Sequence, residues 1–491
     1  MAQKNFKVER VYDMSDTFKR LYAQGQSGKI FNDLYGLIVK ESNILLAMKN
    51  IKLSINRNTK GVDGKTISYY EKISDEKIIQ LVKRRFNNFK PMKIRRIFIP
   101  KDNGTRRNLG VLTFEDRLIQ QCIRQVLEPV CESKFHPNSF GFRTLRSTRH
   151  AVNKMILLMQ MSKYDYCVDI DIKDFFDSVN HEVLINQIYN LGFHDKKLLA
   201  IISKMLKANV EGEGIKKFGL IQGGVLSPLL SNIVLNELDW WINSQCKMTS
   251  QAPTENKIYF VRYADDFKIL CKTFSDAFKI FNTVKVWLKE NLKLDISSEK
   301  SKILNLKTQG SEFLGFKVKA TIKNNAYVVE SHISDSNKLR IKNKLCKIIS
   351  RINKDGKNSE KVLQDFNRQI IIAHRYYQAA SHVRQDFLSI SKQFQSLLDS
   401  KLKNIAQKVS FLPAPNIMTY KINDTVLIPI EYIIKKSDAV KFSKTSMKKF
   451  HFNEKTSQNL QLDKKSDGGL IQNIKKSVSD FFLKLSVSWQ V

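Results

Sequence analysis

Two adjacent aspartates between two alternating apolar segments constrain the fold of this chain more than any other feature. Asp265 and Asp266 lie within residues 257–271, where apolar side chains recur at alternate positions. This alternation predicts two strands, and aspartate tolerates the dihedral angles of the tight turn between them. Two carboxylates at the tip of a rigid hairpin suit a hard divalent cation such as Mg²⁺. Adjacent acids are also common at ordinary solvated turns, so the other motifs must decide between the two interpretations.

A second acidic segment has the pattern of a buried strand. Val168, Ile170 and Ile172 alternate with Asp169 and Asp171, so one face of the predicted strand is apolar and the other carries carboxylates. Carboxylates that project from a buried strand are costly unless cations compensate them. The pattern therefore indicates a second candidate cation site near the end of this strand.

A pair of glycines precedes an apolar segment with helical spacing. Gly223 and Gly224 permit close approach of the backbone to a ligand, and the helix is expected from Pro228 onward. This turn could cradle a base pair or a phosphate. It could equally be a loop that only needs left-handed dihedral angles.

The rest of the chain has a simple expected organisation. Residues 1 to about 90 have a mainly helical pattern, and residues 93–110 predict a basic hairpin that could hold phosphates or only face water. Residues 333–408 predict three helices. The tail from about residue 410 predicts a strand near residues 425–434 and an amphipathic helix at its end.

Charge restricts the class of partner. The chain has 491 residues, 42% of them hydrophobic, which is enough for a folded protein with more than one domain. Its net charge of +36 indicates a polyanionic partner, and nucleic acid is the first candidate. A solvated lysine-rich surface is the plainer alternative, and an anionic membrane is a weaker one.

The expected location is the cytoplasm. No apolar run reaches about 18 residues, and the first ten residues lack the apolar core of a secretory signal. The cysteines lie far apart, with none in a Cys-x-x-Cys pair, which is typical of buried free thiols in a reducing compartment. They are residues 122, 131, 167, 246, 271 and 346.

The order of these sites fits the palm domain of a polymerase, and the chain resembles the reverse transcriptases encoded by group II introns, which also act as maturases. The resemblance covers about residues 30–405. It rests on ordered motifs: Gly-Val-Asp-Gly at 61–64, Ile-Pro-Lys at 99–101 with Gly104 and Arg107, Asp-Arg at 116–117, Leu-Glu-Pro at 127–129, Ser-Phe-Gly-Phe-Arg at 139–143, Asp-Ile-Lys-Asp-Phe-Phe-Asp at 171–177, Gln-Gly-Gly-Val-Leu-Ser-Pro at 222–228, Tyr-Ala-Asp-Asp at 263–266 and Phe-Leu-Gly-Phe at 313–316.

The resemblance implies an α+β fold shaped as a right hand, in which a palm with an antiparallel sheet follows the fingers. The implied domains are a helical extension and the start of the fingers at residues 1–90, fingers and palm at 91–320, a helical thumb or maturase domain at 321–408, and a C-terminal extension of unknown role at 409–491.

The resemblance also implies the chemistry: an RNA template is copied into DNA from a DNA or RNA primer with dNTPs. Two Mg²⁺ ions, with Mn²⁺ as an alternative, would be held by Asp171, Asp265, Asp266 and the carbonyl of Ile172, and the three aspartates would be catalytic. Nucleotide-binding positions would be Lys101, Arg107, Phe176, Gln222, Gly223 and Lys300, with Phe176 selecting deoxynucleotides. The primer grip would be Phe313, Leu314, Gly315 and Phe316.

Departures from the family leave alternatives open. Family members usually carry proline at Asn108, Leu112 and Ile221, and threonine at Ser301, which favours a specialised branch. The template would be a structured intron RNA or a dedicated non-coding RNA. A host-adopted antiphage reverse transcriptase and an RNA-binding maturase that assists splicing are the alternatives to an intron-encoded polymerase. The oligomeric state and the priming mode do not follow from the sequence.

Overall fold

The computed structural model describes residues 12–54, 58–100, 104, 106–248, 258–353, 357–412 and 414–433, apart from the side chains of residues 246–248. The chain divides into two compact units, Met1–Asn305 and Leu306–Val491. Both units mix helices and sheets, in agreement with the expected α+β class. The four domains implied by the resemblance, with their boundaries, stay predictions.

The first unit begins with helices that pack on one long helix, α7. Ser74 and Thr113 cap α6 and α7 by accepting hydrogen bonds from Lys77 N and Asp116 N, which explains where these two helices begin. Four of the preceding helices contact α7 directly. The helices are α2 (Ser15–Gln26), α3 (Tyr35–Ile38), α4 (Glu41–Lys52), α5 (Ile67–Tyr70), α6 (Asp75–Asn87) and α7 (Phe114–Lys134).

A basic hairpin separates α6 from α7. Its strands β1 (Arg95–Pro100) and β2 (Arg106–Val111) are antiparallel, with Ile99 opposite Arg107. At its base, Ile94 forms an isolated bridge with Val210, in the small pair β4 (Asn209–Val210) and β5 (Gly214–Ile215).

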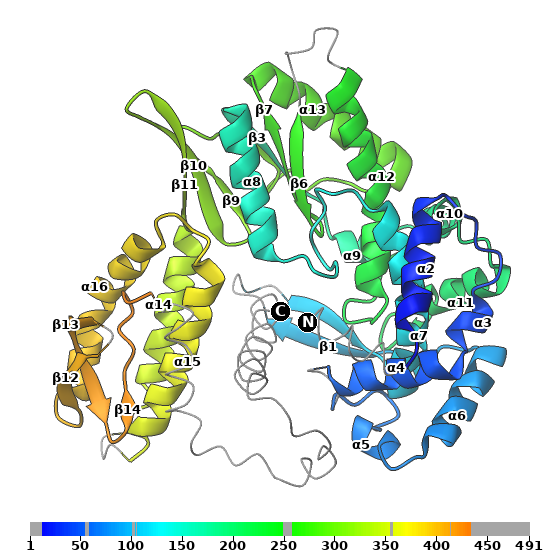
Figure 1. Ribbon diagram of the computed structural model, residues 1–491, viewed down its shortest axis with the longest axis horizontal. Coiled ribbons are helices and arrows are strands. Elements are labelled where there is room, and N and C mark those ends of the chain that lie inside the picture. The colour runs from blue at the N-terminus through cyan, green and yellow to red at the C-terminus, as the bar shows by residue number, and fades with distance from the viewer. Residues whose placement is uncertain are drawn as a thin grey trace, which may run out of the picture. The chain divides into compact units, whose positions relative to one another are not determined.

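This unit contains a four-stranded antiparallel sheet in the order β6-β7-β3-β8, and Figure 1 labels its strands β3, β6 and β7. The strands are β3 (Tyr166–Asp171), β6 (Tyr259–Tyr263), β7 (Asp266–Cys271) and β8 (Lys302–Asn305). Helix α13 (Phe274–Trp287) packs against β3, β7 and β8, whereas α8 (Thr148–Ser162) and α12 (Ser227–Met248) contact β6. The apolar residues of the alternating segments, such as Ile170, Phe267 and Ile269, are buried as their periodicity predicts.

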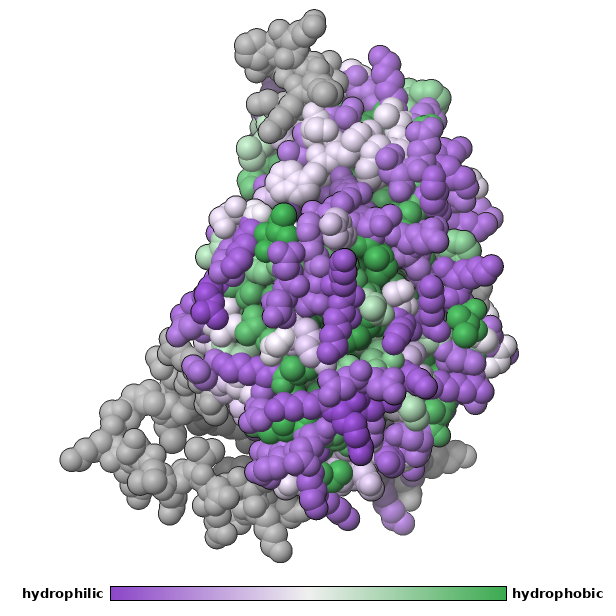
Figure 2. Space-filling model, turned by 90° about the vertical axis from the view of Figure 1, so that its right-hand side faces the viewer, coloured by the Kyte–Doolittle hydropathy of each residue, from purple (hydrophilic) through white to green (hydrophobic). Residues whose placement is uncertain are grey.

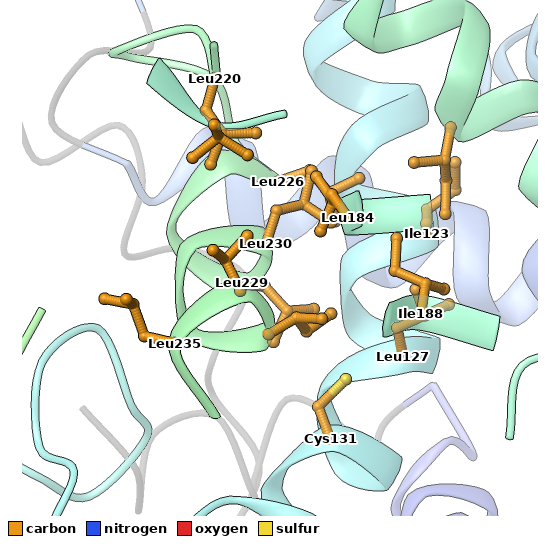
Figure 3. Packing of buried hydrophobic residues seen from close by; sticks show 14 of the residues in the cluster. Ile123, Leu127, Cys131, Leu184, Ile188, Leu220, Leu226, Leu229, Leu230 and Leu235 are labelled. Atoms are coloured by element: carbon orange, nitrogen blue, oxygen red, sulfur yellow. The ribbon is translucent and has the colours of Figure 1, made fainter. Parts of the chain in front are cut away.

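The core continues from the sheet into the helices beside it. Ile123 and Leu127 of α7, Leu184 and Ile188 of α10 (His181–Asn190) and several leucines of α12 belong to one apolar core, part of which Figure 3 shows from close by. This packing anchors α12, and therefore the glycine loop that precedes it. The remaining helical segments of the unit are α9 (Phe175–Ser178), α10 (His181–Asn190), α11 (Lys196–Leu206) and a π-helical turn at Leu288–Leu292.

The second unit combines two small sheets with three helices. Strands β9 (Ser311–Phe313), β10 (Phe316–Lys323) and β11 (Ala326–Ile333) form one sheet, and α14 (Asp335–Ile349), α15 (Ser359–Tyr377) and α16 (Val383–Leu402) follow it. The other sheet comprises β12 (Gln407–Phe411), β13 (Ala414–Ile422) and β14 (Thr425–Val426). The predicted C-terminal amphipathic helix lies outside the described residues.

The long hairpin β10–β11 is not among the elements expected from the sequence. Its turn consists of Asn324 and Asn325, with φ of 49° and 59°. Asparagine adopts such left-handed angles more readily than most residues, and a pair of them favours a two-residue hairpin. The signal was therefore present in the sequence.

Free thiols agree with expectation where the structure describes them. Cys122, Cys131, Cys167 and Cys271 are buried and Cys346 is partly exposed, while the side chain of Cys246 lies outside the described residues.

Within the described part of the chain, no helix is long and apolar enough to cross a membrane. Figure 2 shows one face on which hydrophilic side chains predominate and hydrophobic ones are scattered.

Candidate active site

The sheet brings the two acidic segments together. Ala264 and Asp265 form the turn between β6 and β7, and Asp266 opens β7. Asp266 is paired with Tyr263 on one side and with Asp171, the last residue of β3, on the other. Directly opposite residues project on the same face of a sheet, so Asp171 and Asp266 are neighbours and Asp265 is adjacent to both.

A buried arginine holds this turn. Arg262 is 1% exposed, and its Nε and Nη2 donate to the two carboxylate oxygens of Asp239 on α12, at 2.7 and 2.5 Å. Its Nη1 donates to the carbonyl of Ala264 at 2.7 Å. Ala264 has φ of 56°, a region that residues with a side chain rarely adopt, so this hydrogen bond stabilises a strained turn.

The loop that contains the Ser-Phe-Gly-Phe-Arg motif packs against the same turn. A Cβ atom on Gly141 would lie 2.2 Å from the backbone nitrogen of Ala264, so only glycine fits there. Asn232 of α12 donates to the Gly141 carbonyl at 2.8 Å and accepts from Arg262 at 3.2 Å. Asn232, Asp239 and Arg262 were not singled out from the sequence, because only the tertiary fold brings α12 to the hairpin.

Lys268 lies between two of the aspartates. Its Nζ is 3.2 Å from Asp169 Oδ2 and 3.2 Å from Asp266 Oδ1, and its side chain is 7% exposed. Burial lowers the pKa of Lys268, but Asp266 and Asp169 outweigh it and the pKa is raised overall. The charge of Asp169 is therefore paired with that of a lysine. A lysine two residues after Asp266 on an otherwise apolar strand was the signal for this pairing.

Desolvation dominates the electrostatics of the turn. The Asp266 side chain is 41% exposed, but the surrounding protein removes water from its carboxyl group. This desolvation raises the pKa of Asp266 to about 6, and the charge of Lys268 opposes the shift. Desolvation also raises the pKa of Asp265, and the charge of Asp171 adds to it, while Arg262 and Arg107 act in the opposite direction. Asp265 and Asp171 are therefore close enough to repel each other, as two ligands of one cation must be.

The backbone of Asp171 is held from the other side by the segment before β8. Ser301 Oγ accepts from Asp171 N at 3.1 Å and lies 3.3 Å from Asp171 O, which also accepts from Ser297 N at 2.7 Å. Serine in place of the usual threonine keeps this hydroxyl. Lys300 Nζ lies 3.6 Å from Asp171 Oδ1, and both side chains are exposed.

Ile172 continues from β3 and forms an antiparallel bridge with Ile296. The hydrogen bonds beside this bridge belong to its neighbours, since Asp171 O accepts from Ser297 N and Lys173 N donates to Asp295 O. The bridge therefore fixes the backbone at Ile172 without using its carbonyl in these two bonds.

The donor set fits a hard divalent cation, because it consists of carboxylate oxygens at the surface end of a buried sheet. Among the described residues, one group of three His, Cys, Asp or Glu side chains has its ligand atoms within 4.8 Å of one another, and it lies in the second unit. The carboxylates of Asp171, Asp265 and Asp266 are not gathered this tightly, and Asp266 is paired with Lys268.

The glycine loop joins the basic hairpin to this site. Gly110 N on β2 donates to Gln222 O at 2.7 Å, and Gly223, with φ of 103°, comes so close that an added Cβ would lie 2.7 Å from Gly110 O. This contact brings Gln222 and Gly223 next to the strand that carries Arg107. Lys101 lies outside the described residues.

Phe176 lies between the acidic strand and the glycine loop. Its carbonyl accepts from Leu220 N at 2.5 Å, and its half-buried ring makes edge contacts with Phe142 and Phe175, at centroid distances of 6.4 and 5.5 Å. These contacts restrict the rotation of the ring.

Residues 313–316 form a tight turn in the second unit. Leu314 and Gly315 have φ of 53° and 81°, and their carbonyls accept from Tyr376 Oη at 3.0 Å and Ser334 N at 2.9 Å. Phe313 and Phe316, opposite each other in β9 and β10, are fully buried. The predicted primer grip is thus a rigid turn in the unit that does not contain the aspartates.

Comparisons with known proteins show what this chain is similar to. A model of the family "Reverse transcriptase (RNA-dependent DNA polymerase)" matches residues 99–318, which include both acidic segments and the glycine loop. Protein YkfC of Escherichia coli (strain K12) is 31% identical over 291 residues, which cover 53% of this chain and 76% of that protein.

Intron-encoded proteins are also similar to this chain. Group II intron-encoded protein LtrA of Lactococcus lactis subsp. cremoris is 29% identical over 380 residues, which cover 65% of this chain and 62% of LtrA. The putative COX1/OXI3 intron 2 protein of Saccharomyces cerevisiae is 28% identical over 346 residues, which cover 60% of this chain and 39% of that protein. The chain thus spans less than two thirds of the length of these two relatives.

The chain belongs to the reverse transcriptase family that includes group II intron-encoded proteins and intron maturases. It is therefore an enzyme of the RNA-directed DNA polymerase class, and proteins of this class generally use divalent metal ions and an RNA template.

Proposed function

We propose that this enzyme makes cDNA from an RNA template by two-metal nucleotidyl transfer in a right-hand fold. The four-stranded sheet is the palm, β1–β2 with the N-terminal helices is the fingers, α14 to α16 form the thumb, and residues 409–491 are an extension of unknown role. The observation that carries this proposal is the register that sets Asp171 opposite Asp266, with Asp265 on the turn beside them.

In this proposal Asp171 and Asp265 are the principal ligands of two Mg²⁺ ions, with Mn²⁺ as the alternative ion. When bound there, the ions would supply Lewis acidity to a primer 3′-hydroxyl and positive charge to the leaving pyrophosphate. The Ile172 carbonyl is a further ligand. Asp266 shares its charge with Lys268, so it shapes the local field and takes a smaller part in ligation.

The nucleotide is held by groups around the aspartates. Arg107 already lowers the pKa of Asp265, so its guanidinium is near enough to bind the triphosphate of a dNTP, together with Lys101. Gln222 and Gly223 line the pocket, and Phe176 packs under the sugar, where it excludes a ribose 2′-hydroxyl. Lys300 protonates the leaving pyrophosphate.

Partners follow from the family and from charge. The template is a structured RNA, either an intron or a dedicated non-coding RNA, and the primer is DNA or RNA. Residues 313–316 position the primer end. The basic helices of the second unit bind the A-form duplex or the template RNA by its backbone.

Intron-encoded proteins and maturase-like proteins are among the relatives, so assistance of splicing by RNA binding is a second candidate function. Retention of Asp171, Asp265 and Asp266 favours the polymerase. A host-adopted defence enzyme is the third candidate, and intron RNA domains around the gene would argue against it.

Primer extension tests the proposal. Purified protein with Mg²⁺, an annealed RNA template and DNA primer, and either dNTPs or rNTPs should extend the primer with dNTPs only. Asp265→Ala should abolish extension and keep RNA binding, whereas Asp276→Ala, at an exposed helix start, should behave like the wild type. Tight RNA binding without extension by the wild type, on this template and on intron RNA, would favour the maturase.

A further inference from the structure

A second cluster of metal-ligating side chains lies in the second unit, outside the residues assigned to polymerisation. Glu330 and His332 project from β11, and His382 immediately precedes α16. One ligand atom from each of the three lies within 4.8 Å of the others. Sequence patterns did not indicate this cluster, because His382 is brought to β11 by backbone contacts such as His382 N to Ser331 O, 3.1 Å.

Both imidazole rings are oriented by a partner on Nδ1. His332 Nδ1 lies 3.2 Å from Asp386 Oδ1, and the Asp386 side chain is 4% exposed and accepts from Ile333 N at 2.8 Å. His382 Nδ1 lies 2.8 Å from Ser381 Oγ. Hydrogen bonds of this kind fix the tautomer of a metal-binding histidine and leave Nε2 for the ion.

We propose that Glu330, His332 and His382 bind Zn²⁺ or a similar borderline transition-metal ion. Two neutral imidazoles and one carboxylate form a common ligand set for Zn²⁺, whereas Mg²⁺ prefers oxygen ligands alone. The ligand side chains are 13%, 29% and 23% exposed, so the site is partly enclosed and a water molecule can complete a tetrahedral set.

Two local changes accompany binding. Lys323 Nζ lies 2.5 Å from Glu330 Oε1, and its side chain is 58% exposed, so it can move into solvent when the ion takes its place. The imidazole rings are stacked, with centroids 4.5 Å apart and planes at 22°. One ring therefore tilts so that both Nε2 atoms reach the ion at the usual distance of about 2.0–2.1 Å.

The ion would join β11 to the beginning of α16, two elements of the same unit. Binding to the folded state alone stabilises that state, so the melting temperature of the protein should rise with Zn²⁺ concentration. This role is independent of the polymerase chemistry and of the proposed function.

The test uses the full chain, stripped of metal and kept in excess Mg²⁺ so that the carboxylate site is occupied. Calorimetric titration with Zn²⁺ should show one saturable site. Ser381→Ala removes the hydrogen-bond partner of His382 Nδ1 and should weaken binding by roughly 10–100-fold. His332→Gln and His382→Gln each remove a ligand and should weaken binding more than Ser381→Ala does. The control His194→Gln, a histidine of the first unit stacked on Tyr189, should bind as the wild type does.

Co²⁺ provides a second measurement, because tetrahedral binding gives visible absorption bands. Circular dichroism at neutral pH should show that the glutamine variants are folded. Zn²⁺ binding that the two histidine substitutions leave unchanged, or the lack of any saturable site in the wild type, would overturn the proposal. A rise in melting temperature in the wild type that is missing in both variants would support it.

Discussion

At the scale of single residues, Arg262 is a buried charge whose hydrogen bonds hold the turn at Ala264 in place. A buried ion pair often stabilises a protein no better than apolar residues of the same size, because both charges lose their hydration. Arg262 is nevertheless placed where no apolar side chain could replace its hydrogen bond to Ala264 O. We therefore expect its contribution to activity to exceed its contribution to stability.

Two variants separate these contributions. Arg262→Met leaves Asp239 buried without its partner and should lower the free energy of unfolding by about 3–5 kcal/mol. The double variant Arg262→Met with Asp239→Leu should recover most of that stability. It should nevertheless extend primers at least about tenfold more slowly than the wild type, which corresponds to an activation barrier higher by roughly 1.4 kcal/mol. Chemical denaturation and single-turnover extension measure the two quantities. A double variant with the wild-type rate would show that the pair serves stability alone.

Phe176 carries the expected selectivity for deoxynucleotides. Phe176→Ala removes the ring that would clash with a 2′-hydroxyl, so the ratio of dNTP to rNTP incorporation should fall by roughly tenfold or more, or about 1.4 kcal/mol of discrimination. Steady-state extension with each nucleotide measures the ratio. Phe274→Ala, an exposed phenylalanine at the start of α13, is the control and should keep the wild-type ratio. If Phe176→Ala and Phe274→Ala had the same ratio of dNTP to rNTP incorporation, Phe176 would not be the residue that selects deoxynucleotides.

At the scale of elements, close backbone contacts and buried polar groups decide which segments meet. Gly110 and Gly223 let β2 approach the loop before α12, and Gly141 lets another loop approach the turn at Ala264. In the second unit, His374 of α15 plays a comparable part. Its Nε2 donates to Ile430 O at 2.9 Å, and its ring packs on Phe387 of α16.

The burial of His374 predicts acid sensitivity. Desolvation lowers its pKa from 6.5 to about 4, so protonation favours the unfolded state. Stability is retained above the unfolded pKa and is lost as the pH falls from about 6.5 towards 4, by about 2–3 kcal/mol at pH 4.5. Other groups that titrate in this range act equally on the wild type and on a variant.

His374→Gln isolates this contribution, because glutamine keeps a donor for Ile430 O and cannot take up a proton in this range. Chemical denaturation at pH 7.5 and pH 4.5 should show a smaller loss for the variant than for the wild type. Equal losses in both would mean that His374 is not the titrating group.

At the scale of the whole molecule, the net charge of +36 sets the expected mode of binding. Contacts with phosphates release counterions, so the affinity for structured RNA should fall by roughly a thousandfold or more between about 50 and 200 mM salt. Filter binding or fluorescence anisotropy measures this slope. Asp265→Ala should have the same slope, because it changes catalysis and leaves the basic surface intact. An affinity that does not depend on salt would contradict charge-driven binding.

Most elements followed from local patterns. The hairpin at residues 259–271, the strand ending at Asp171, the helix after Gly224 and the three helices of the second unit are all visible as period-two or helical spacing. The hairpin β10–β11 was missed although Asn324 and Asn325 are typical of such a turn. The roles assigned to individual site residues stay predictions, but Asp171, Asp265 and Asp266 do lie together at one end of the sheet.

The sequence by itself determined the family and the α+β class and pointed to three aspartates as candidate ligands, because the ordered motifs and their periodicity are local properties. Only the tertiary structure decided which side chains pair with the aspartates and hold the turn that carries them. Lys268 meets Asp169 through strand register, Asp239 meets Arg262 across a helix and a strand, and His382 meets His332 from 50 residues away. Such pairings depend on how elements pack after they form, and no local pattern encodes the distance between them.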